Sequence, residues 1–393
     1  MTTVCEKYHI TPISDLQNIS SKIFLVRVDF NVPIGNTGII LDSFRIKNSI
    51  PTIDFLLKNN AIVILISHLG DPKSPNETLS FSPLIEQMEI MLNCQIHLLV
   101  EHNLQVIGDQ IDKHKTDIGQ RKVFLLDNIR HFPEEKTNDS TFANAFVNQL
   151  RINFYVNDAF SVSHRKHTSV VAIPSIMERK FAGLALVREL EMLESTLGNA
   201  FNSQTKITAI IGGKKVATKL LLLKSLTKKV HNLVIVGGMA NTFLKARGVD
   251  IGESFYEPDM LAVALDIKNC ILPIDFVNQD CEVVTDITGN MAIYDIGPRS
   301  LNIIDSIISD SDLILWNGPA GIYEDARFAG GSHGIATSIN KYGVKAIVGG
   351  GDTVAIINKL DTSNNIYISS GGGAFIAWLK NRNLPGIIAI SAQ

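Results

Sequence analysis

A glycine-rich turn near the end of the chain has the composition of an anion site. Residues 347–357 read IVGGGDTVAII, which predicts the end of a strand, three glycines and the start of a helix. Unpaired N–H groups and the positive end of the helix dipole suit a phosphate at such a junction, and the aspartate suits an accompanying Mg²⁺. Tight turns also select glycine for steric reasons alone, so this stretch by itself leaves both interpretations open.

Cations follow the apolar runs in the first half of the chain. The runs are KIFLVRVDF, AIVILISH, KVFLLDN and INFYVNDAF, and Arg27, His68, Arg130 and the HRKH segment at 164–167 lie at or near their ends. In open parallel sheets, ligands bind beyond the carboxyl ends of the strands. A lone arginine or histidine usually has a structural or solvated role, but several cations at one edge would repel one another without an anion. We therefore predict a pocket for a small anion.

Glycines follow the corresponding runs in the second half. The segments are IIGGKK, IVGGMANTF, WNGPAG, IVGGGDT and ISSGGGAF, and Lys215 and Lys219 lie one helical turn apart after the first of them. Backbone-lined turns with lysines suit a polyphosphate. The GxxxxGK[ST] and GxGxxG fingerprints are absent, so neither a P-loop NTPase nor a Rossmann dehydrogenase is directly supported. Phosphoryl transfer between the two predicted sites is the simplest chemistry.

The elements that must position these residues follow an α/β pattern. Short runs rich in valine and isoleucine alternate with amphipathic stretches, which predicts parallel sheets with crossover helices. At 393 residues the chain exceeds the usual size of one core, so we expect two domains. Residues 187–198, VRELEMLESTLG, predict a linking helix, although an ordinary domain helix fits the same pattern. One face of an earlier predicted helix carries Ile46, Ile50, Ile53 and Leu57.

The composition argues against several other classes of protein. The formal net charge is −3, without the positive charge that accompanies non-specific nucleic-acid binding. The longest apolar runs, such as AIVILI at 61–66, are far shorter than a bilayer span, and the start MTTVCEKYHI lacks the apolar core of a signal sequence. The four cysteines show no CxxC spacing and are expected to be reduced thiols. We expect a cytoplasmic protein with no nucleic-acid or membrane partner.

At these motifs the sequence closely resembles the phosphoglycerate kinase family. The segments RVDFNVP, SHLG, LLDNIR, VNDAF with HRKH, GGKKV, GGMANTFL, LPIDFV, WNGPAGIYE, GGGDT and SGGGAF follow the family's order along nearly the whole chain. The resemblance implies a bilobal α/β protein of two doubly wound parallel-sheet, Rossmann-like domains joined by a helical hinge. It implies an acid-substrate domain at 1–186 on which the tail 380–393 packs back, a linking helix at 187–200 and a nucleotide-binding domain at 201–379.

The resemblance also implies the reaction and the residues that perform it. The reaction is reversible phosphoryl transfer from 1,3-bisphosphoglycerate to Mg-ADP, which gives 3-phosphoglycerate and ATP, in a protein expected to be a monomer. The residues that carry over to catalysis are Arg45 and Lys215. Those that carry over to the acid substrate are Arg27, Asp29, Phe30, Asn31, Arg45, His68, Leu69, Gly70, Asp71, Arg130, His164, Arg165 and His167. Those that carry over to ADP or ATP are Lys219, Glu324, Gly350, Gly351, Asp352 and Thr353, with Glu324 facing the ribose and Asp352 binding Mg²⁺.

The implied chemistry agrees with the residue types. In the ATP-consuming direction the nucleophile is a carboxylate that is already ionised at neutral pH, so no general base is required. A site rich in cations without a poised base is therefore expected. Substrates on separate domains also imply that a cleft closes to bring them in line and exclude water.

The chain departs from the family pattern at several positions. Asp71, in SHLGDP, stands where the family usually has an arginine for the substrate's non-transferring phosphate. A charge pair at about 4 Å is worth roughly 4 kcal/mol at an effective dielectric near 20, so this change of sign predicts weaker binding of the acid substrate. Lys73 could compensate. Lys166 is an additional cation, and Ala377 replaces a usual glutamate.

Three other functions remain open on the sequence. The altered SHLGDP pocket permits a kinase for a different small carboxylic acid. The fold also permits a nucleotide-binding pseudoenzyme, although the joint retention of Arg45, Lys215, Lys219, Asp352 and Thr353 argues against it. A nicotinamide dehydrogenase is disfavoured by the missing dinucleotide fingerprint.

Overall fold

The chain divides into two compact units. The computed structural model describes residues 3–35, 37–72, 79–115, 121–198, 200–202, 204–357 and 365–392. Unit 1 contains Met1–Glu194 and Asn381–Gln393, and unit 2 contains Ser195–Lys380. Both units combine parallel sheets with helices, so the predicted α/β class is confirmed.

The described residues of unit 1 form one six-stranded sheet. Its strands are β1 (Ile23–Arg27), β2 (Ile62–Ile66), β3 (Gln95–Leu99), β4 (Lys122–Leu126), β5 (Phe154–Asn157) and β6 (Lys180–Ala182). The order is β3-β4-β2-β1-β5-β6, and every neighbouring pair is parallel. All residues of β1 and β2 are buried, which explains why they read as continuous apolar runs.

The helices of unit 1 pack their apolar residues against this sheet. Ile46 and Ile53, on the predicted apolar face, join the core, although that face spans two helices rather than one. The helices are α1 (Val4–Tyr8), α2 (Phe44–Asn48), α3 (Ile50–Lys58), α4 (Ile85–Leu92), α5 (Leu104–His114), α6 (Glu134–Thr137), α7 (Ser140–Gln149), α8 (Ile173–Ile176), α9 (Leu184–Leu197) and α17 (Pro385–Ile388). Short turns are η1 (Ile13–Asp15), η2 (Ser82–Leu84), η4 (Ile129–His131), η5 (Phe160–Val162) and η6 (Thr168–Ala172).

Helix α9 corresponds to the predicted linking helix and contains the boundary between the units, at Glu194 and Ser195. Leu190, Leu193 and Leu197 lie on one face of this helix and are buried. At its start, the carboxylate of Asp158 accepts hydrogen bonds from Thr52 Oγ1 (2.8 Å) and from the N–H of Ala185 (2.9 Å). Burial raises the pKa of Asp158 to about 7.

Unit 2 contains a five-stranded parallel sheet and a small antiparallel one. The parallel strands are β7 (Ile207–Ile211), β8 (Asn232–Ile235), β12 (Leu313–Asn317), β13 (Lys345–Gly349) and β14 (Ile366–Ile368), in the order β14-β13-β12-β7-β8. All five runs predicted as strands are therefore present. The antiparallel strands are β9 (Phe276–Asn278), β10 (Val283–Val284) and β11 (Ile293–Ile296), in the order β10-β9-β11.

The helices of unit 2 follow its strands. They are α10 (Leu220–Leu226), α11 (Gly238–Ala246), α12 (Leu261–Asp266), α13 (Pro298–Ser309), α14 (Gly330–Tyr342), α15 (Gly351–Ile357) and α16 (Gly372–Lys380), with turns η7 (Ala200–Asn202), η8 (Ala217–Lys219), η9 (Pro258–Met260) and η10 (Ala326–Phe328). Over the described ranges, no helix is long and apolar enough to cross a bilayer.

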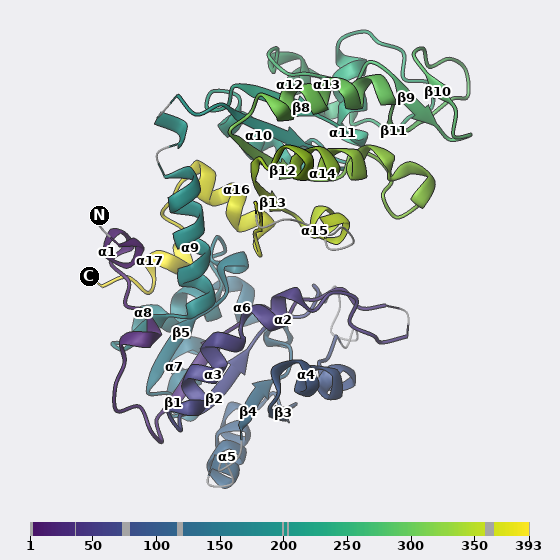
Figure 1. The fold of residues 1–393 in the computed structure, drawn as a ribbon. Helices are drawn as coiled ribbons and strands as arrows, with labels where there is room; N and C mark the ends of the chain where they lie inside the picture. Colours follow the sequence, from purple (N-terminus) through teal and green to yellow (C-terminus); the bar gives the residue numbers. More distant parts are fainter. Residues whose placement is uncertain are drawn as a thin grey trace. The chain divides into compact units, whose positions relative to one another are not determined.

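The C-terminal segment belongs to unit 1, where α17 and α1 lie side by side near the two ends of the chain (Figure 1). The N–H of Gly386 donates to the carbonyl of Ser163 (2.8 Å), and the N–H of Ala392 donates to the carbonyl of His9 (2.7 Å). The side chain of Asn157, at the end of β5, donates to the carbonyl of Gly386 (3.2 Å). The tail thus packs beside the strand end that carries the predicted substrate residues.

Candidate active site

The parallel register of unit 1 brings the predicted acid-binding residues to one edge of its sheet. Arg27 is the register partner of Ile66 in β2 and Asn157 in β5, and Ile66 is the partner of Leu126 in β4. The segments that follow these strands therefore begin side by side. They carry Asp29, Phe30, Asn31, His68, Leu69, Gly70, Asp71, Arg130, His164, Arg165 and His167.

Arg45 reaches this edge from α2 and is held by the segment after β1. Its Nη1 lies 3.0 Å from Asp29 Oδ2 and donates to the carbonyl of Asn31 (3.0 Å). The Asp29 carboxylate also accepts from Ser161 Oγ (2.5 Å), and Asn31 Oδ1 accepts from the N–H of Gly70 (2.8 Å). These contacts orient Arg45 while 29% of its side chain stays exposed, so it can still meet a ligand.

Phe30 and Leu69 contribute to the edge through their backbones. Their side chains are buried in the core, with exposed fractions of 0% and 3%. The N–H of Phe30 donates to Ser67 Oγ (2.8 Å). The amide of Asn128 accepts from the N–H of Leu69 (3.1 Å) and donates to its carbonyl (2.8 Å). Ser67 and Asn128 support these backbones, and neither was predicted as a site residue. Ser67 lies in the SHLG segment and Asn128 in the LLDNIR segment.

Arg27 lies beneath the edge rather than on it. It is 1% exposed, and its guanidinium donates to Ser169 Oγ (2.9 Å) and to the carbonyls of Val28 (2.6 Å) and Ile66 (3.3 Å). Its Nη2 also donates to His68 Nδ1 (3.3 Å). Burial and the charge of Arg27 lower the pKa of His68 well below its usual value, so His68 is neutral at pH 7. Arg27 therefore sets the tautomer and orientation of His68.

Arg130 and His164 carry buried nitrogens that lack a partner among the described residues. The side chain of Arg130 is 5% exposed, and its Nη1 donates to the carbonyl of Gly70, while its Nε is unpaired. Burial, together with the charge of Arg165, lowers the pKa of Arg130 and lowers that of His164 to about 4. His164 Nδ1 is likewise unpaired. The unsatisfied donor of Arg130, beside the like charge of Arg165, is a feature of an anion site.

Asp71 lies at this edge and is engaged by two cations. Its Oδ1 accepts from Lys136 Nζ of α6 and lies 3.5 Å from Arg130 Nη1. The hydrogen bond from Lys136 is the main cause that lowers the pKa of the Asp71 carboxyl. Lys136 is thus a partner that the sequence did not indicate, and Lys73, the predicted compensating cation, lies outside the described residues.

His167 lies beside a buried glutamate. Its Nδ1 lies 3.6 Å from Glu135 Oε1. Glu135 is fully buried and accepts from the N–H and the Oγ of Ser169 (2.8 and 2.7 Å), and Ser169 also binds Arg27. Glu135 therefore holds the 164–169 segment in place. No sequence signal marked Glu135, because a glutamate in the charged run FPEEKT reads as a surface charge.

Lys219 is half-buried beneath the glycine turns of unit 2. Its Nζ donates to the carbonyls of Gly212 (2.6 Å) and Asn317 (2.8 Å). Burial lowers the pKa of Lys219 to about 8, while the charge of Asp352 acts in the opposite direction. Gly318 has a φ of +98°, and a Cβ there would lie 2.2 Å from Lys219 Nζ, so only glycine leaves room for the lysine.

The turn before α15 is fixed by neighbouring strand ends. Thr353 Oγ1 accepts from the N–H of Gly318 (2.7 Å), and Asn317 Nδ2 donates to the carbonyl of Gly349 (2.9 Å). Gly350 has a φ of +98°, which a side chain would strain. Asp352, exposed at the start of α15, accepts from the hydroxyl of Tyr323 (3.2 Å). The predicted residues 350–353 thus meet the WNGPAGIYE segment.

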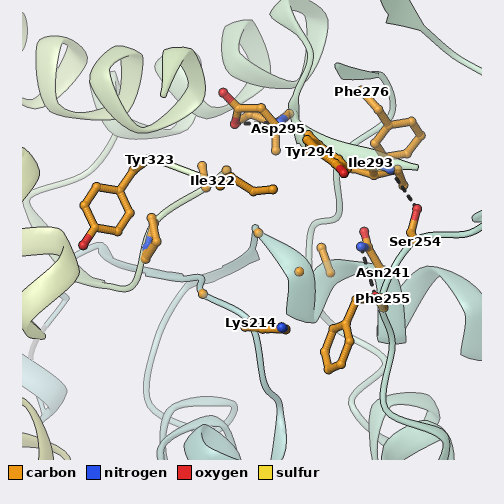
Figure 2. A pocket seen from close by; sticks show the side chains of 18 of the residues that line it. Lys214, Asn241, Ser254, Phe255, Phe276, Ile293, Tyr294, Asp295, Ile322 and Tyr323 are labelled. Carbon is orange, nitrogen blue, oxygen red and sulfur yellow. Dashed lines mark hydrogen bonds between the residues drawn. The ribbon is translucent and has the colours of Figure 1, made fainter. Parts of the chain in front are cut away.

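A cavity of about 490 Å³ opens beside these turns. Its lining includes Glu324 and Asp352, which were predicted, and Lys214, Asn241 and Phe255, which were not. Figure 2 shows Tyr323 at one side of the cavity and Asn241 with Phe255 at the other. Asn241 lies within the GGMANTFL motif, whereas no motif marks Phe255. Lys215, the predicted catalytic lysine, is exposed, and its carbonyl accepts from Thr218 Oγ1 (2.9 Å).

An edge of cations in one α/β unit, and in the other a glycine-lined cavity with a half-buried lysine beneath its turns, define a class of phosphotransferase. Comparison with known proteins identifies the family. The family model described as phosphoglycerate kinase matches residues 13–382. The chain therefore belongs to the phosphoglycerate kinase family, whose members are phosphotransferases with a carboxyl group as acceptor.

Individual relatives cover nearly the whole chain. The phosphoglycerate kinase of Nostoc sp. is 36% identical over 394 residues, which cover 95% of this chain and 96% of the relative. The phosphoglycerate kinase of Wolbachia sp. subsp. Brugia malayi is 36% identical over 406 residues, with coverages of 97% and 99%. Among solved structures, those from Coxiella burnetii and Pyrococcus horikoshii superpose with TM-scores of 0.77 and 0.83 at 31% and 25% identity, each covering 97% of this chain and 98% of the other.

Proposed function

We propose that the protein transfers a phosphoryl group reversibly between 1,3-bisphosphoglycerate and Mg-ADP, giving 3-phosphoglycerate and ATP. Family membership supports the reaction. The observation that carries the acid-binding role of unit 1 is the buried guanidinium of Arg130, whose Nε has no partner in the described part of the chain. An anionic ligand would supply that partner and offset the repulsion from Arg165.

The acid substrate would bind at the edge of unit 1. We assign direct contacts to Asp29, Asn31, Arg45, His68, Arg130 and Arg165. Arg45 is preoriented by Asp29. His68 is neutral, and because its Nδ1 accepts from Arg27, its Nε2 can donate one hydrogen bond without adding charge. Arg27 acts as a positioning residue, because all its observed contacts are with the protein. His167 and the neutral His164 complete the edge.

The nucleotide would bind in the cavity of unit 2. Glu324 would meet the ribose, and Lys219 with Gly350, Gly351 and Thr353 would hold the phosphates. Asp352 suits Mg²⁺, because Mg²⁺ takes one or two carboxylates together with phosphate and water oxygens, and this carboxylate is exposed with one observed hydrogen bond. When bound, Mg²⁺ would neutralise charge on the phosphate oxygens.

The chemistry requires positioning rather than a base. In the ATP-consuming direction, a carboxylate oxygen of 3-phosphoglycerate forms a bond to the γ-phosphorus as the bond to the ADP oxygen breaks, and ADP carries away the electron pair. The carboxylate is already ionised, so no proton has to be removed. Arg45 and Lys215 would stabilise the equatorial oxygens of the moving group. Since the substrates are assigned to different units, turnover requires the units to bring them together.

A coupled assay with a panel of acids tests this proposal. Purified protein, MgATP and 3-phosphoglycerate, coupled to NADH oxidation through glyceraldehyde-3-phosphate dehydrogenase, should give sustained turnover. Glycerate, 2-phosphoglycerate and acetate, followed by ADP release, should give far less. Preference for one of those acids would favour the second candidate, a kinase for another carboxylic acid, which the negative charge of Asp71 at the edge also permits. If none of the acids stimulates the release of ADP from ATP, both proposals are contradicted.

We also propose that the enzyme acts in the cytoplasm as a monomer. Membership of a glycolytic family supports the cytoplasmic location. The domain organisation supports the monomeric state, since each substrate site is built from residues of one unit. Sedimentation at micromolar concentration should give a mass near 43.1 kDa. A stable dimer would contradict the proposed state.

A further inference from the structure

A smaller cavity lies within unit 1, where the C-terminal tail packs. Its volume is about 300 Å³, at the lower end of the usual range for small-molecule sites. Its walls come from the segment after β5, from α8, from the start of β6 and from the tail, and they include Lys166, Ser175, Lys180, Pro385, Ile388 and Ser391. Among the described residues that line it, none is assigned to the acid substrate or to the nucleotide.

Two lysines line this cavity without a counter-charge. Lys166, the additional cation of the HRKH segment, is exposed, and Lys180, at the start of the edge strand β6, is half-buried. Within the described part of the chain, neither ammonium forms a hydrogen bond or an ion pair, and no carboxylate lines the cavity. By contrast, Lys7, Lys115 and Lys136 of unit 1 each pair with a carboxylate. The charge of the cavity therefore favours an anionic ligand.

The remaining walls are hydroxyl groups and apolar side chains. Ser391 Oγ donates to the carbonyl of Ile388 (2.8 Å), and its oxygen can still accept a hydrogen bond. The hydroxyl of Ser175 makes no hydrogen bond with the residues that the structure describes. Val171, Pro385 and Ile388 supply apolar surface, and Ile388 is 56% exposed. An inorganic anion would leave this surface in water, whereas an apolar group on the ligand would cover it.

We propose that this cavity binds a small organic anion with an apolar body. The acidic group interacts with Lys166 and Lys180, and the apolar body covers Ile388. Carboxylates and phosphate monoesters share this chemistry, so the test below includes one of each. The binding itself does not depend on the proposed function.

The cavity adjoins the acid-binding edge through both of its walls. Lys166 follows Arg165 directly in the chain, and the N–H of Gly386 in the tail donates to the carbonyl of Ser163 (2.8 Å). A bound ligand would therefore hold the tail against the segment that carries Arg165. The amide hydrogen of Gly386 should then exchange more slowly when the ligand is present. An unchanged exchange rate would show that the ligand does not bind across the tail.

Methyl NMR of isoleucine-labelled protein tests the inference at a named position. The signal of Ile388 is assigned by its loss in Ile388→Val, and excess 3-phosphoglycerate and MgADP fill the sites already proposed. Phenyl phosphate and phenylacetate should each shift the Ile388 signal in a saturable way. Inorganic phosphate, which lacks the apolar body, and benzyl alcohol, which lacks the charge, should bind more weakly. Saturable binding of either acid supports the inference, and the tighter of the two identifies the acidic group.

Paired variants test the two charges. Lys166→Met and Lys180→Met keep the length of the side chain, and each should weaken binding of the tighter acid by about fivefold, the effect of losing one partly exposed charge pair. Lys22→Met is the matched control, because Lys22 is an exposed lysine of unit 1 outside the cavity lining. Its affinity for the acid should equal that of the wild type.

Three results would overturn the inference. The first is the absence of a saturable shift at Ile388 with either acid. The second is binding of benzyl alcohol or inorganic phosphate as tightly as phenyl phosphate. The third is an unchanged affinity in both Lys166→Met and Lys180→Met. If the acids bind here but the protein phosphorylates none of the acids in the coupled assay, this site stands and the proposed function fails.

Discussion

At the scale of single residues, Asp71 offers a sharp test of the acid-binding edge. Its carboxylate forms ion pairs with Arg130 and Lys136, two cations that could otherwise bind an anionic substrate. Asp71→Arg should lower the KM for 3-phosphoglycerate by about fivefold, an effect kept modest because Asp71 is 65% exposed and solvent screens its charge. The measurement is the initial rate at saturating MgATP.

Asp71→Asn serves as the control for this change, because it removes the negative charge without adding a positive one. Its KM should fall between those of the wild type and Asp71→Arg. An unchanged or raised KM in Asp71→Arg would show that the charge of Asp71 does not weaken the binding of 3-phosphoglycerate.

Lys219 predicts a pH dependence of nucleotide binding. Burial lowers its pKa to about 8, so the free enzyme loses this positive charge as the pH rises from 7 to 9. The kcat/KM for MgATP should therefore fall above pH 8, because kcat/KM reports the free enzyme. The kcat/KM for 3-phosphoglycerate at saturating MgATP should stay flat over the same range, since bound polyphosphate keeps the lysine charged. A flat profile for MgATP would contradict the assigned role.

Residue types in the motifs were predictable, but their connections were not. The sequence indicated that Arg27 and His68 lie near one another at strand ends. It could not show that Arg27 is buried and donates its hydrogen bonds to Ser169 and to backbone carbonyls. These contacts depend on the register of β1 with β2 and on the fold of 164–169. The pairing of Asp71 with Lys136 likewise depends on where α6 lies.

At the scale of elements, the glycine turns of unit 2 make a steric prediction. A Cβ on Gly318 would lie 2.2 Å from Lys219 Nζ and 2.3 Å from the carbonyl oxygen of Gly212. Gly318→Ala should therefore displace Lys219 and weaken ADP binding by tenfold or more, roughly the effect of losing one charged contact. Calorimetric titration of the variant with MgADP measures this directly.

Gly289→Ala separates the steric effect from backbone strain. Gly289 also has a positive φ (+59°), but nothing lies within 4 Å of the added Cβ. This variant should lose only about 1 kcal/mol of stability and retain ADP affinity. Equal ADP affinity in the two variants would refute the packing of Lys219 beneath the turn.

The main strands were predictable because they are buried on both faces and read as apolar runs. The edge strands β3 and β6 of unit 1 were not predicted, because they are only partly buried and do not read as continuous apolar runs. In β3 the first residue is exposed and two others are half-buried, and β6 has only three residues, so pairing with β4 and β5 defines them. The antiparallel sheet was missed because its short strands, such as Val283–Val284, carry no periodic signal.

At the scale of the whole molecule, the C-terminal tail should stabilise unit 1 selectively. Both tryptophans, Trp316 and Trp378, are buried in unit 2, so their fluorescence reports unit 2 alone. Deletion of 381–393 removes the hydrogen bonds of Gly386 to Ser163 and Asn157. The thermal transition seen by circular dichroism should then gain an early phase, while the fluorescence transition stays in place. If the circular dichroism and fluorescence transitions fell by the same amount, the tail would not stabilise unit 1 selectively.

The central claim is the transfer itself, and ATP formation from 1,3-bisphosphoglycerate and MgADP, followed with luciferase, tests it most directly. We predict ATP in amounts equal to the acyl phosphate consumed. Arg45→Ala and Lys215→Ala should each lower kcat by about a hundredfold or more while ADP still binds. Binding of ADP by the wild-type protein without any formation of ATP would contradict the account.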